Sequence, residues 1–246
     1  GGFVCLVDGD GEYSLQEEKM NQLMKHIDPT GNGDFSCVSI IGCQSTGKST
    51  LLNRLFDTRF AMMDSGKGRS QTTKGLWLDA ARNTKGLLVI DVEGTDSGER
   101  STNQTKEKEN FERQSILYAL ALSEIMIVNM WETDIGRWNG SNFGIMKTVF
   151  EVNMQLFRSK TKTQILFIIR DYNEEGTPFS SLRKRLLSEL HGIWDTLQKP
   201  EEYKEVSMED FFDIRFTYLP HFVYRRDKFE EIALKLRAKF NINEPE

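Results

Sequence analysis

Short apolar runs alternate along this chain with longer segments whose apolar residues recur at helical spacing. Runs such as residues 37–41 and 164–169 are apolar almost throughout, which is typical of strands buried on both faces of a sheet. Segments such as 182–197 carry apolar residues three and four positions apart, which indicates amphipathic helices. The pattern predicts strands at residues 37–41, 76–78, 86–92, 124–130, 164–169 and 214–219, and helices at residues 48–56, 111–122, 142–157, 182–197 and 229–240.

This alternation of apolar strands and helices predicts an α/β fold with a mainly parallel central sheet and helices on both faces. In such a sheet, ligands bind at the carboxyl ends of the strands, so residues that follow strands are the first candidates for function. Two polar segments without periodicity, residues 64–73 and 96–110, predict a mobile loop and a surface excursion.

The composition is that of an ordinary globular protein, and it excludes several functions. A chain of 246 residues can build one large α/β domain or two small ones. Its net charge of −5 argues against wholesale nucleic-acid binding, which usually needs a basic balance. The three cysteines and three histidines lack the spacing of a disulfide framework or a zinc site, which indicates a reduced, cytosolic protein.

Membrane and export signals are not evident in the sequence. No apolar run approaches the ~18 residues that span a bilayer, and no basic segment followed by an apolar one begins the chain. Because the chain starts with Gly1 rather than Met, we expect it to be an excised piece of a longer protein.

Residues 42–49 match the phosphate-loop pattern GxxxxGK[ST], between a predicted strand and a predicted helix. Backbone N–H groups of such a loop point at phosphate oxygens, assisted by the N-terminus of the helix. Gly42 and Gly47 allow the tight turn. Lys48 would reach the β- and γ-phosphates, and the Ser49 hydroxyl would bind Mg²⁺. A glycine loop that only turns a corner is the alternative, and the strand–loop–helix context disfavours it.

Two further motifs fit a site that senses a γ-phosphate. Asp91 and Gly94 form a DxxG at the end of a predicted strand. An aspartate there can hold Mg²⁺ through water, and the Gly94 N–H can sense the γ-phosphate. Thr73, with Thr72 as the second choice, would complete the Mg²⁺ shell through its hydroxyl. The alternative is an ordinary acidic turn and two threonines that start a strand.

Arg170 and Asp171 follow the predicted strand 164–169. Guanine carries its N1–H and N2–H₂ donors side by side, so one carboxylate can accept from both, whereas adenine would leave that carboxylate unpaired. Arg170 could lay its stem and flat head along the base. An exposed ion pair between the two residues is an equal alternative, because the NKxD form that would settle the base is absent.

Longer strings extend these motifs over nearly the whole chain. They are residues 7–11, 42–53, 68–78, 91–96, 129–132, 147–153 and 169–171. The strings RSQTTKG, NMWE and KTVFEVN are far more specific than the phosphate loop alone. On these strings, the chain resembles the GTPase domain of the dynamin superfamily. More narrowly, it is similar to the atlastin-like, root-hair-defective and yeast-type proteins that fuse endoplasmic-reticulum membranes.

The resemblance implies a P-loop GTPase domain with a dynamin-like fold and extra strands, over residues 1–246, without the helical bundle and membrane segments that follow in the family. It implies that Arg170 and Asp171 read the base, and that residues 218–222, His221 included, close over it. The phosphate loop would bind GTP or GDP through Gly42, Cys43, Gln44, Ser45, Thr46, Gly47, Lys48, Ser49 and Thr50.

The same resemblance implies partners and a place in the cell. Two such domains on opposing membranes would form a GTP-dependent homodimer, at the cytosolic face of the endoplasmic reticulum. Membrane contact would come only through segments absent from this chain, and the domain itself would be soluble.

The interior of the phosphate loop departs from the animal atlastins, which resemble guanylate-binding proteins in having an arginine at the fourth position of GxxxxGKS, counted from the first glycine. Ser45 follows Gln44 here, as in dynamin, where the pair helps to place the attacking water and a monovalent cation. Arg69 is a possible substitute for the arginine, or it orders its loop by pairing with a carboxylate. The expected catalytic residues are Gln44, Ser45, Lys48, Thr73 and Arg69, and the expected metal ligands are Ser49, Thr73 and Asp91.

Three functions remain open at this point. The favoured one is a GTPase whose turnover is coupled to dimerisation and membrane fusion. The second is a GTP-regulated tether that hydrolyses little, because the loop lacks an arginine and Thr95 stands after the DxxG motif in place of a glutamine. The third is an ATPase with the same loop, against which the Arg170–Asp171 pair argues.

Overall fold

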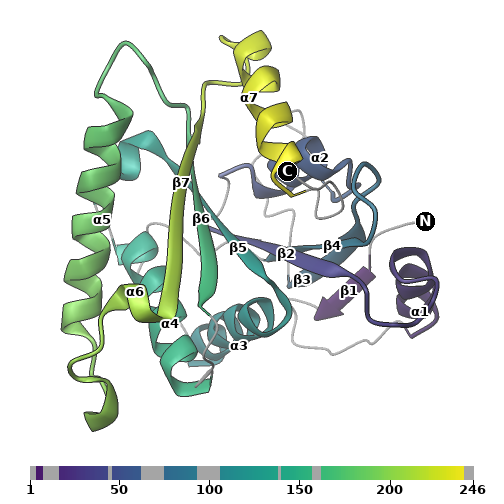
Figure 1. Ribbon diagram of the computed structural model, residues 1–246, viewed down its shortest axis with the longest axis horizontal. Helices are drawn as coiled ribbons and strands as arrows, with labels where there is room; N and C mark the ends of the chain where they lie inside the picture. Colours follow the sequence, from purple (N-terminus) through teal and green to yellow (C-terminus); the bar gives the residue numbers. More distant parts are fainter. Residues whose placement is uncertain are drawn as a thin grey trace.

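The computed structural model describes residues 4–7, 17–43, 46–61, 75–92, 106–137, 140–156 and 162–240, and Figure 1 labels its elements. The strands are β1 (Val4–Val7), β2 (Ser36–Ile41), β3 (Leu76–Ala80), β4 (Leu87–Val92), β5 (Ile125–Trp131), β6 (Thr163–Arg170) and β7 (Phe212–Leu219). The helices are α1 (Glu17–Ile27), α2 (Lys48–Phe56), α3 (Lys106–Leu122), α4 (Gly140–Leu156), α5 (Phe179–Thr196), α6 (Met208–Phe211) and α7 (Arg226–Ala238), with 3-10 helices η1 (Glu132–Asp134) and η2 (Glu201–Tyr203).

The described strands form a seven-stranded sheet in the order β1-β3-β4-β2-β5-β6-β7. Strands β4, β2, β5, β6 and β7 run parallel, whereas β3 pairs antiparallel with β4, and β1 pairs antiparallel with β3. The sheet is therefore mainly parallel, as predicted. Strands β1 and β3 extend it at one edge.

Both faces of the sheet are covered, because successive side chains of the central strands point to opposite sides. In β6, Phe167 packs into a cluster with α4 and α5, while its neighbour Ile168 packs into a second cluster with α2 and α7. Figure 1 shows α2 and α7 on one side of the sheet and α3, α4 and α5 on the other. This explains why β2, β4 and β5 lack the polar alternation of a half-exposed strand.

Every predicted strand and helix is present. The differences are in the boundaries of some elements and in short or sparsely buried elements that were not predicted. Helix α3 begins at Lys106, within the predicted surface excursion and five residues before the predicted start. Helix α1 escaped prediction because it buries only Leu23 and Ile27, which is too sparse for a recognisable stripe. Strand β1 spans four residues and α6 four, which is too short for a periodic signal.

The predicted loop at residues 64–73 lies outside the described residues. None of the described helices has the length and apolar character that crossing a membrane requires.

Candidate functional site

The candidate residues meet at the carboxyl edge of the parallel strands. The phosphate loop joins β2 to α2, Asp91 lies at the end of β4, and Arg170 is the last residue of β6. Strand register brings them together, because Asp91 lies opposite Ile40 of β2, the residue before the end of that strand. Asn129, near the end of β5, completes the row. Segments far apart in the chain therefore form one site, as expected for a parallel sheet.

Both glycines of the phosphate loop are required by geometry. Gly47 caps helix α2 in the left-handed conformation, with φ 73° and ψ 31°. Gly42 has φ 149°, and a Cβ atom there would lie only 2.3 Å from the backbone oxygen of Asn129. The first glycine thus allows the loop to pass closely over β5, and the second allows the sharp turn into α2.

Lys48 holds its charge inside the loop. Its side chain is buried, and Nζ donates hydrogen bonds to the backbone oxygens of Gly42, at 3.2 Å, and Cys43, at 3.0 Å. The hydroxyl of Thr46 donates to the same Cys43 oxygen at 2.8 Å. These bonds keep the loop curled around the ammonium group at the N-terminus of α2. A buried cation beside a helix N-terminus is a strong site for an anion.

Ser49 and Asp91 place two oxygens beside the loop. The Ser49 hydroxyl donates to Oδ2 of the fully buried Asp91 at 2.5 Å. Hydroxyl and carboxylate oxygens are ligands that Mg²⁺ prefers, so this donor set fits that ion. The described residues contain no cluster of three or more His, Cys, Asp or Glu that could hold a metal. A cation here would therefore draw further oxygens from another source, such as a bound triphosphate.

Arg170 is buried rather than exposed, which excludes the alternative of a surface ion pair. Its Nη1 atom donates to Oδ1 of Asn129 at 3.4 Å, and its guanidinium lies 5.8 Å from the ring centroids of both Trp131 and Phe229. Burial lowers the pKa of the guanidinium, and the negative charge of Asp171 partly opposes that shift. The head of Arg170 thus faces the interior behind the phosphate loop.

Asp171 stands in the left-handed conformation with φ 57°, which is uncommon outside glycine. The next residue anchors it, because the Tyr172 N–H donates to the Leu219 oxygen at 3.2 Å. The Tyr172 ring packs against Tyr218, with ring centroids 4.6 Å apart, and against Phe179, at 5.6 Å. These contacts hold the Asp171 carboxylate half-exposed at the sheet edge.

His221 faces this carboxylate. Its Nε2 atom lies 3.8 Å from Oδ2 of Asp171, while Nδ1 accepts the backbone N–H groups of Val223, at 3.1 Å, and Tyr224, at 3.3 Å. Because Nδ1 accepts, a neutral imidazole carries its proton on Nε2, the nitrogen that faces Asp171. The arrangement places a donor beside the carboxylate expected to read the base.

The turn that corresponds to the segment expected to close over the base begins two residues later than residue 218. Tyr218 and Leu219 are still part of strand β7, paired with Ile169 and Arg170 of β6, and the turn before α7 comprises residues 220–225. Phe222 fixes this turn to α7, with its ring centroid 5.1 Å from that of Phe229. Aromatic residues of this region therefore contribute to packing of the core and of the turn.

Several predicted site residues lie outside the described residues: Gln44, Ser45, Arg69, Thr72, Thr73 and Gly94. Cys43 is buried in the loop, and Thr50 lies half-buried in the first turn of α2. Asn129 was not predicted as a site residue, although its string NMWE carried the family resemblance. Its position at the end of a strand was the one signal that could have identified it.

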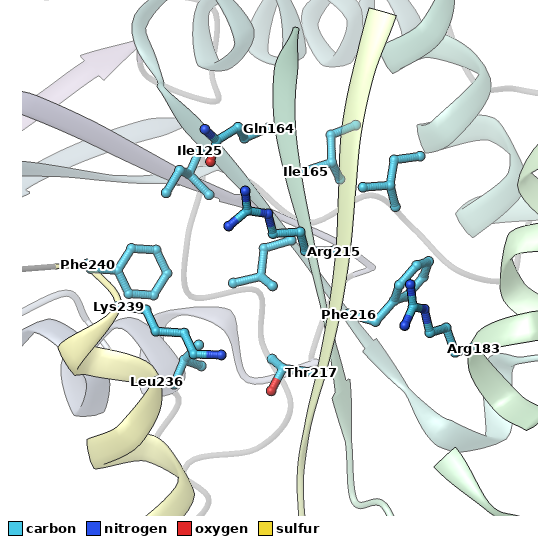
Figure 2. A pocket seen from close by; sticks show the side chains of 12 residues that line it. Ile125, Gln164, Ile165, Arg183, Arg215, Phe216, Thr217, Leu236, Lys239 and Phe240 are labelled. Carbon is cyan, nitrogen blue, oxygen red and sulfur yellow. The ribbon is translucent and has the colours of Figure 1, made fainter. Parts of the chain in front are cut away.

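A hollow of about 290 Å³ lies beside β6 and β7. Figure 2 shows Leu236, Lys239 and Phe240 of the α7 end facing Arg215 and Thr217 of β7 across it. Its lining includes the first residue of β5 and the second of β6, so it lies toward the amino ends of the parallel strands. The hollow is therefore separate from the edge where the phosphate-loop residues converge.

Comparisons with known proteins show the family of the chain. The chain matches the Root hair defective 3 GTP-binding protein (RHD3) GTPase domain over residues 41–245. It is 46% identical over 252 residues to the protein SEY1 homolog of Dictyostelium discoideum, covering 97% of this chain and 28% of the relative. It is 44% identical over 239 residues to the protein ROOT HAIR DEFECTIVE 3 homolog 1 of Arabidopsis thaliana, covering 96% of this chain and 29% of that relative. The chain therefore spans less than a third of the length of these relatives.

Proposed function

The chain belongs to the Root hair defective 3 GTPase-domain family and is a GTPase, and from this premise we propose which residues bind and hydrolyse GTP. The observation that carries the proposal is the convergence of the buried Lys48 ammonium with the Ser49–Asp91 pair at one edge of the sheet. A triphosphate needs a cation for its oxygens and oxygen ligands for its metal, and this edge offers both.

The phosphate loop binds the β- and γ-phosphates in this proposal. Lys48 is already held inside the loop by two backbone oxygens, so it can contact phosphate oxygens with little rearrangement. Ser49, Asp91 and Thr73 would hold Mg²⁺. The ion would neutralise negative charge on the β- and γ-phosphate oxygens.

Asp171 reads the guanine base through the N1–H and N2–H₂ donors. Its left-handed backbone and half-exposed carboxylate are fixed by Tyr172, and His221 lies beside it as a further nucleotide-binding residue. Arg170 acts from behind the loop rather than along the base, since its head is buried against Asn129. An adenine would leave the Asp171 carboxylate without its donors, which favours GTP over ATP.

Hydrolysis relies on positioning and charge stabilisation more than on acid–base chemistry. Gln44 and Ser45 would orient the attacking water and Gly94 would sense the γ-phosphate. Ser45 would also help to hold a monovalent cation, which would supply the positive charge of the missing loop arginine. Arg69 is the second candidate for that charge. An arginine finger contributes about 10³- to 10⁵-fold in related enzymes, so a substitute is needed for efficient turnover.

We propose that GTP binding and hydrolysis control homodimerisation of the domain. Members of the family that carry membrane segments would thereby tether and fuse endoplasmic-reticulum membranes, with this domain on the cytosolic side. A tether with little hydrolysis is the alternative, favoured by the serine at position 45.

Phosphate release from GTP in the presence of Mg²⁺ tests the proposal. We expect Lys48→Ala and Ser49→Asn to lower turnover by about 100-fold or more, because each removes a contact to the charged phosphates or their metal. Lys147→Ala is the matched control, since Lys147 is a half-exposed lysine whose partner is Glu151, 3.9 Å away on the same helix. Undiminished turnover in Lys48→Ala would contradict the proposed site.

A further inference from the structure

Asn129 connects the phosphate loop to the strand that carries the base-reading residue. Its side chain is fully buried near the end of β5. The amide Nδ2 donates to the backbone oxygen of Thr46 in the loop at 2.8 Å, and Oδ1 accepts from Nη1 of Arg170 at 3.4 Å. Both ends of one amide are thus used, one toward the loop and the other toward β6.

The backbone of Asn129 constrains the same loop from a second direction. Its oxygen would lie 2.3 Å from a Cβ atom at Gly42, so the loop rests directly on β5 at this point. Asn129 itself is held in register opposite Ile168 of β6. The support under the loop is therefore a fixed part of the sheet and not an adaptable side chain.

Arg170 determines which way the Asn129 amide points. An amide can turn by 180°, and the donor from Arg170 requires that the oxygen faces the guanidinium and the NH₂ group faces Thr46. Arg170 is itself confined, with Trp131 and Phe229 under its guanidinium and its Nη1 3.8 Å from a Cβ position at Gly47. Its Nε atom has no hydrogen-bond partner among the described residues.

We propose that Asn129 is a positioning residue for the nucleotide site, oriented by Arg170, which aims the Thr46–Gly47 peptide of the phosphate loop. This inference rests on the proposed function. The Thr46 oxygen is held by the Asn129 donor, so the N–H on the other side of that peptide, which belongs to Gly47, turns into the loop. Glycine allows a wide range of backbone conformations, so without the hydrogen bond from Asn129 the Thr46–Gly47 peptide would lose its fixed direction.

Asn129→Asp is the sharpest test, because aspartate has the same shape. It still accepts from Arg170 but places a carboxylate oxygen against the Thr46 oxygen. We expect the Kd for GDP to rise by about tenfold or more and the Kd for GMP by less than about threefold, since only GDP carries a β-phosphate for the loop. Affinities are measured by competition with a fluorescent guanine nucleotide, and folding by thermal unfolding.

Asn153→Asp is the matched control. Asn153 is the other buried asparagine with a described donor, from Nδ2 to Oγ1 of Thr163 at 2.7 Å, and it joins α4 to the start of β6. It undergoes the same chemical change at a place remote from the loop. We expect its ratio of GDP to GMP affinity to match that of the unmodified chain.

Arg170→Met provides a second readout, because methionine fills the space but leaves the Asn129 amide without its orienting donor. We expect the ratio of GDP to GMP affinity to fall here too, by less than in Asn129→Asp. Equal weakening of GDP and GMP in Asn129→Asp, no weakening of either, or a changed ratio in Asn153→Asp would overturn the inference.

Two outcomes on folding and binding complete the design. If Asn129→Asp unfolds, Asn129→Ser is measured instead, since its hydroxyl is too short to reach Thr46 from the strand. If both fail to fold while Asn153→Asp folds, Asn129 serves folding, and the positioning role is overturned. If the unmodified chain binds neither GDP nor GTP, the proposed function itself fails, which is a distinct result.

Discussion

Single atoms decide the shape of the phosphate loop. Gly42 passes so close to the Asn129 oxygen that one added carbon would overlap it, and Gly47 occupies a conformation that other residues adopt only with strain. The contact at Gly42 is with backbone, which cannot move aside as a flexible side chain could. Loop geometry thus depends on the absence of side chains as much as on the presence of Lys48.

Gly42→Ala should destabilise the fold by about 2–4 kcal/mol, because it forces overlap with a buried strand at a positive φ. Urea denaturation followed by circular dichroism measures the free energy of unfolding. Gly192→Ala is the control, in the exposed face of α5 with nothing within 4 Å of its new carbon. There we expect stability to increase by up to about 1 kcal/mol, through helix propensity. Equal stability of the two variants would contradict the described contact.

Asp171→Asn should change base preference while leaving the fold intact. An asparagine can present an N–H to the C2 oxygen of xanthine but cannot accept both donors of guanine. We expect GTP affinity to fall by about 100-fold and XTP affinity to rise. Competition of GTP, XTP and ATP for a fluorescent nucleotide measures this.

Asp213→Asn, at an exposed carboxylate that pairs with Arg215, should leave all three affinities unchanged. If GTP remained preferred over ATP in Asp171→Asn, the base would be read elsewhere.

At the scale of elements, residues 28–34 show how a side chain can end a helix and begin a strand. Asp28 follows α1, and its carboxylate accepts from the backbone N–H groups of Gly33, at 2.7 Å, and Gly31, at 3.0 Å, and from the Thr30 hydroxyl. These bonds lower the pKa of Asp28, the one from Gly33 contributing most. The turn is therefore specified by one carboxylate and the glycines around it.

The lowered pKa of Asp28 determines how folding stability changes with pH. Ionised Asp28 stabilises the turn at pH values above the pKa of an unfolded aspartate, and this contribution is lost as pH falls through the lower, folded pKa. An NMR titration of the Asp28 side chain should give a pKa below the ordinary aspartate value. Asp28→Asn should remove that part of the pH dependence, and an unshifted titration would contradict the described bonds.

Most elements could be predicted from periodicity, because strands buried on both faces and amphipathic helices leave opposite signatures. Helix α1 and strand β1 could not, since the first buries two residues and the second has only four. Residues of the candidate site likewise fall into a predictable group and an unpredictable group. The loop and Asp91 follow from contiguous motifs, whereas the burial of Arg170 and the role of Asn129 depend on neighbouring strands far away in sequence.

At the scale of the molecule, the sheet separates two ends. The residues proposed to bind nucleotide lie at the carboxyl edge of the parallel strands, and the hollow of Figure 2 lies toward the amino ends of these strands. The turn before α7 exposes two apolar residues, Val223 and Tyr224, whose N–H groups bond to His221, the residue that faces the Asp171 carboxylate. A second copy that approaches this end would meet both the nucleotide and exposed apolar surface.

We therefore expect the domain to dimerise with GTP and to return to a monomer as GTP is consumed. Light scattering over the course of hydrolysis measures the mass, with GDP as the control for occupancy of the site. A tether would stay dimeric after adding GTP. A mass that never changes with nucleotide would exclude dimerisation by this domain alone.

The spacing of the site along the chain has a consequence for synthesis. The phosphate loop comes before Asp91 in the chain, and Asp171 comes after both, directly behind β6, which pairs with β5. Under the proposed assignment, a growing chain would therefore contain the residues that hold phosphate before the residue that distinguishes guanine from adenine, and base selectivity would require β6.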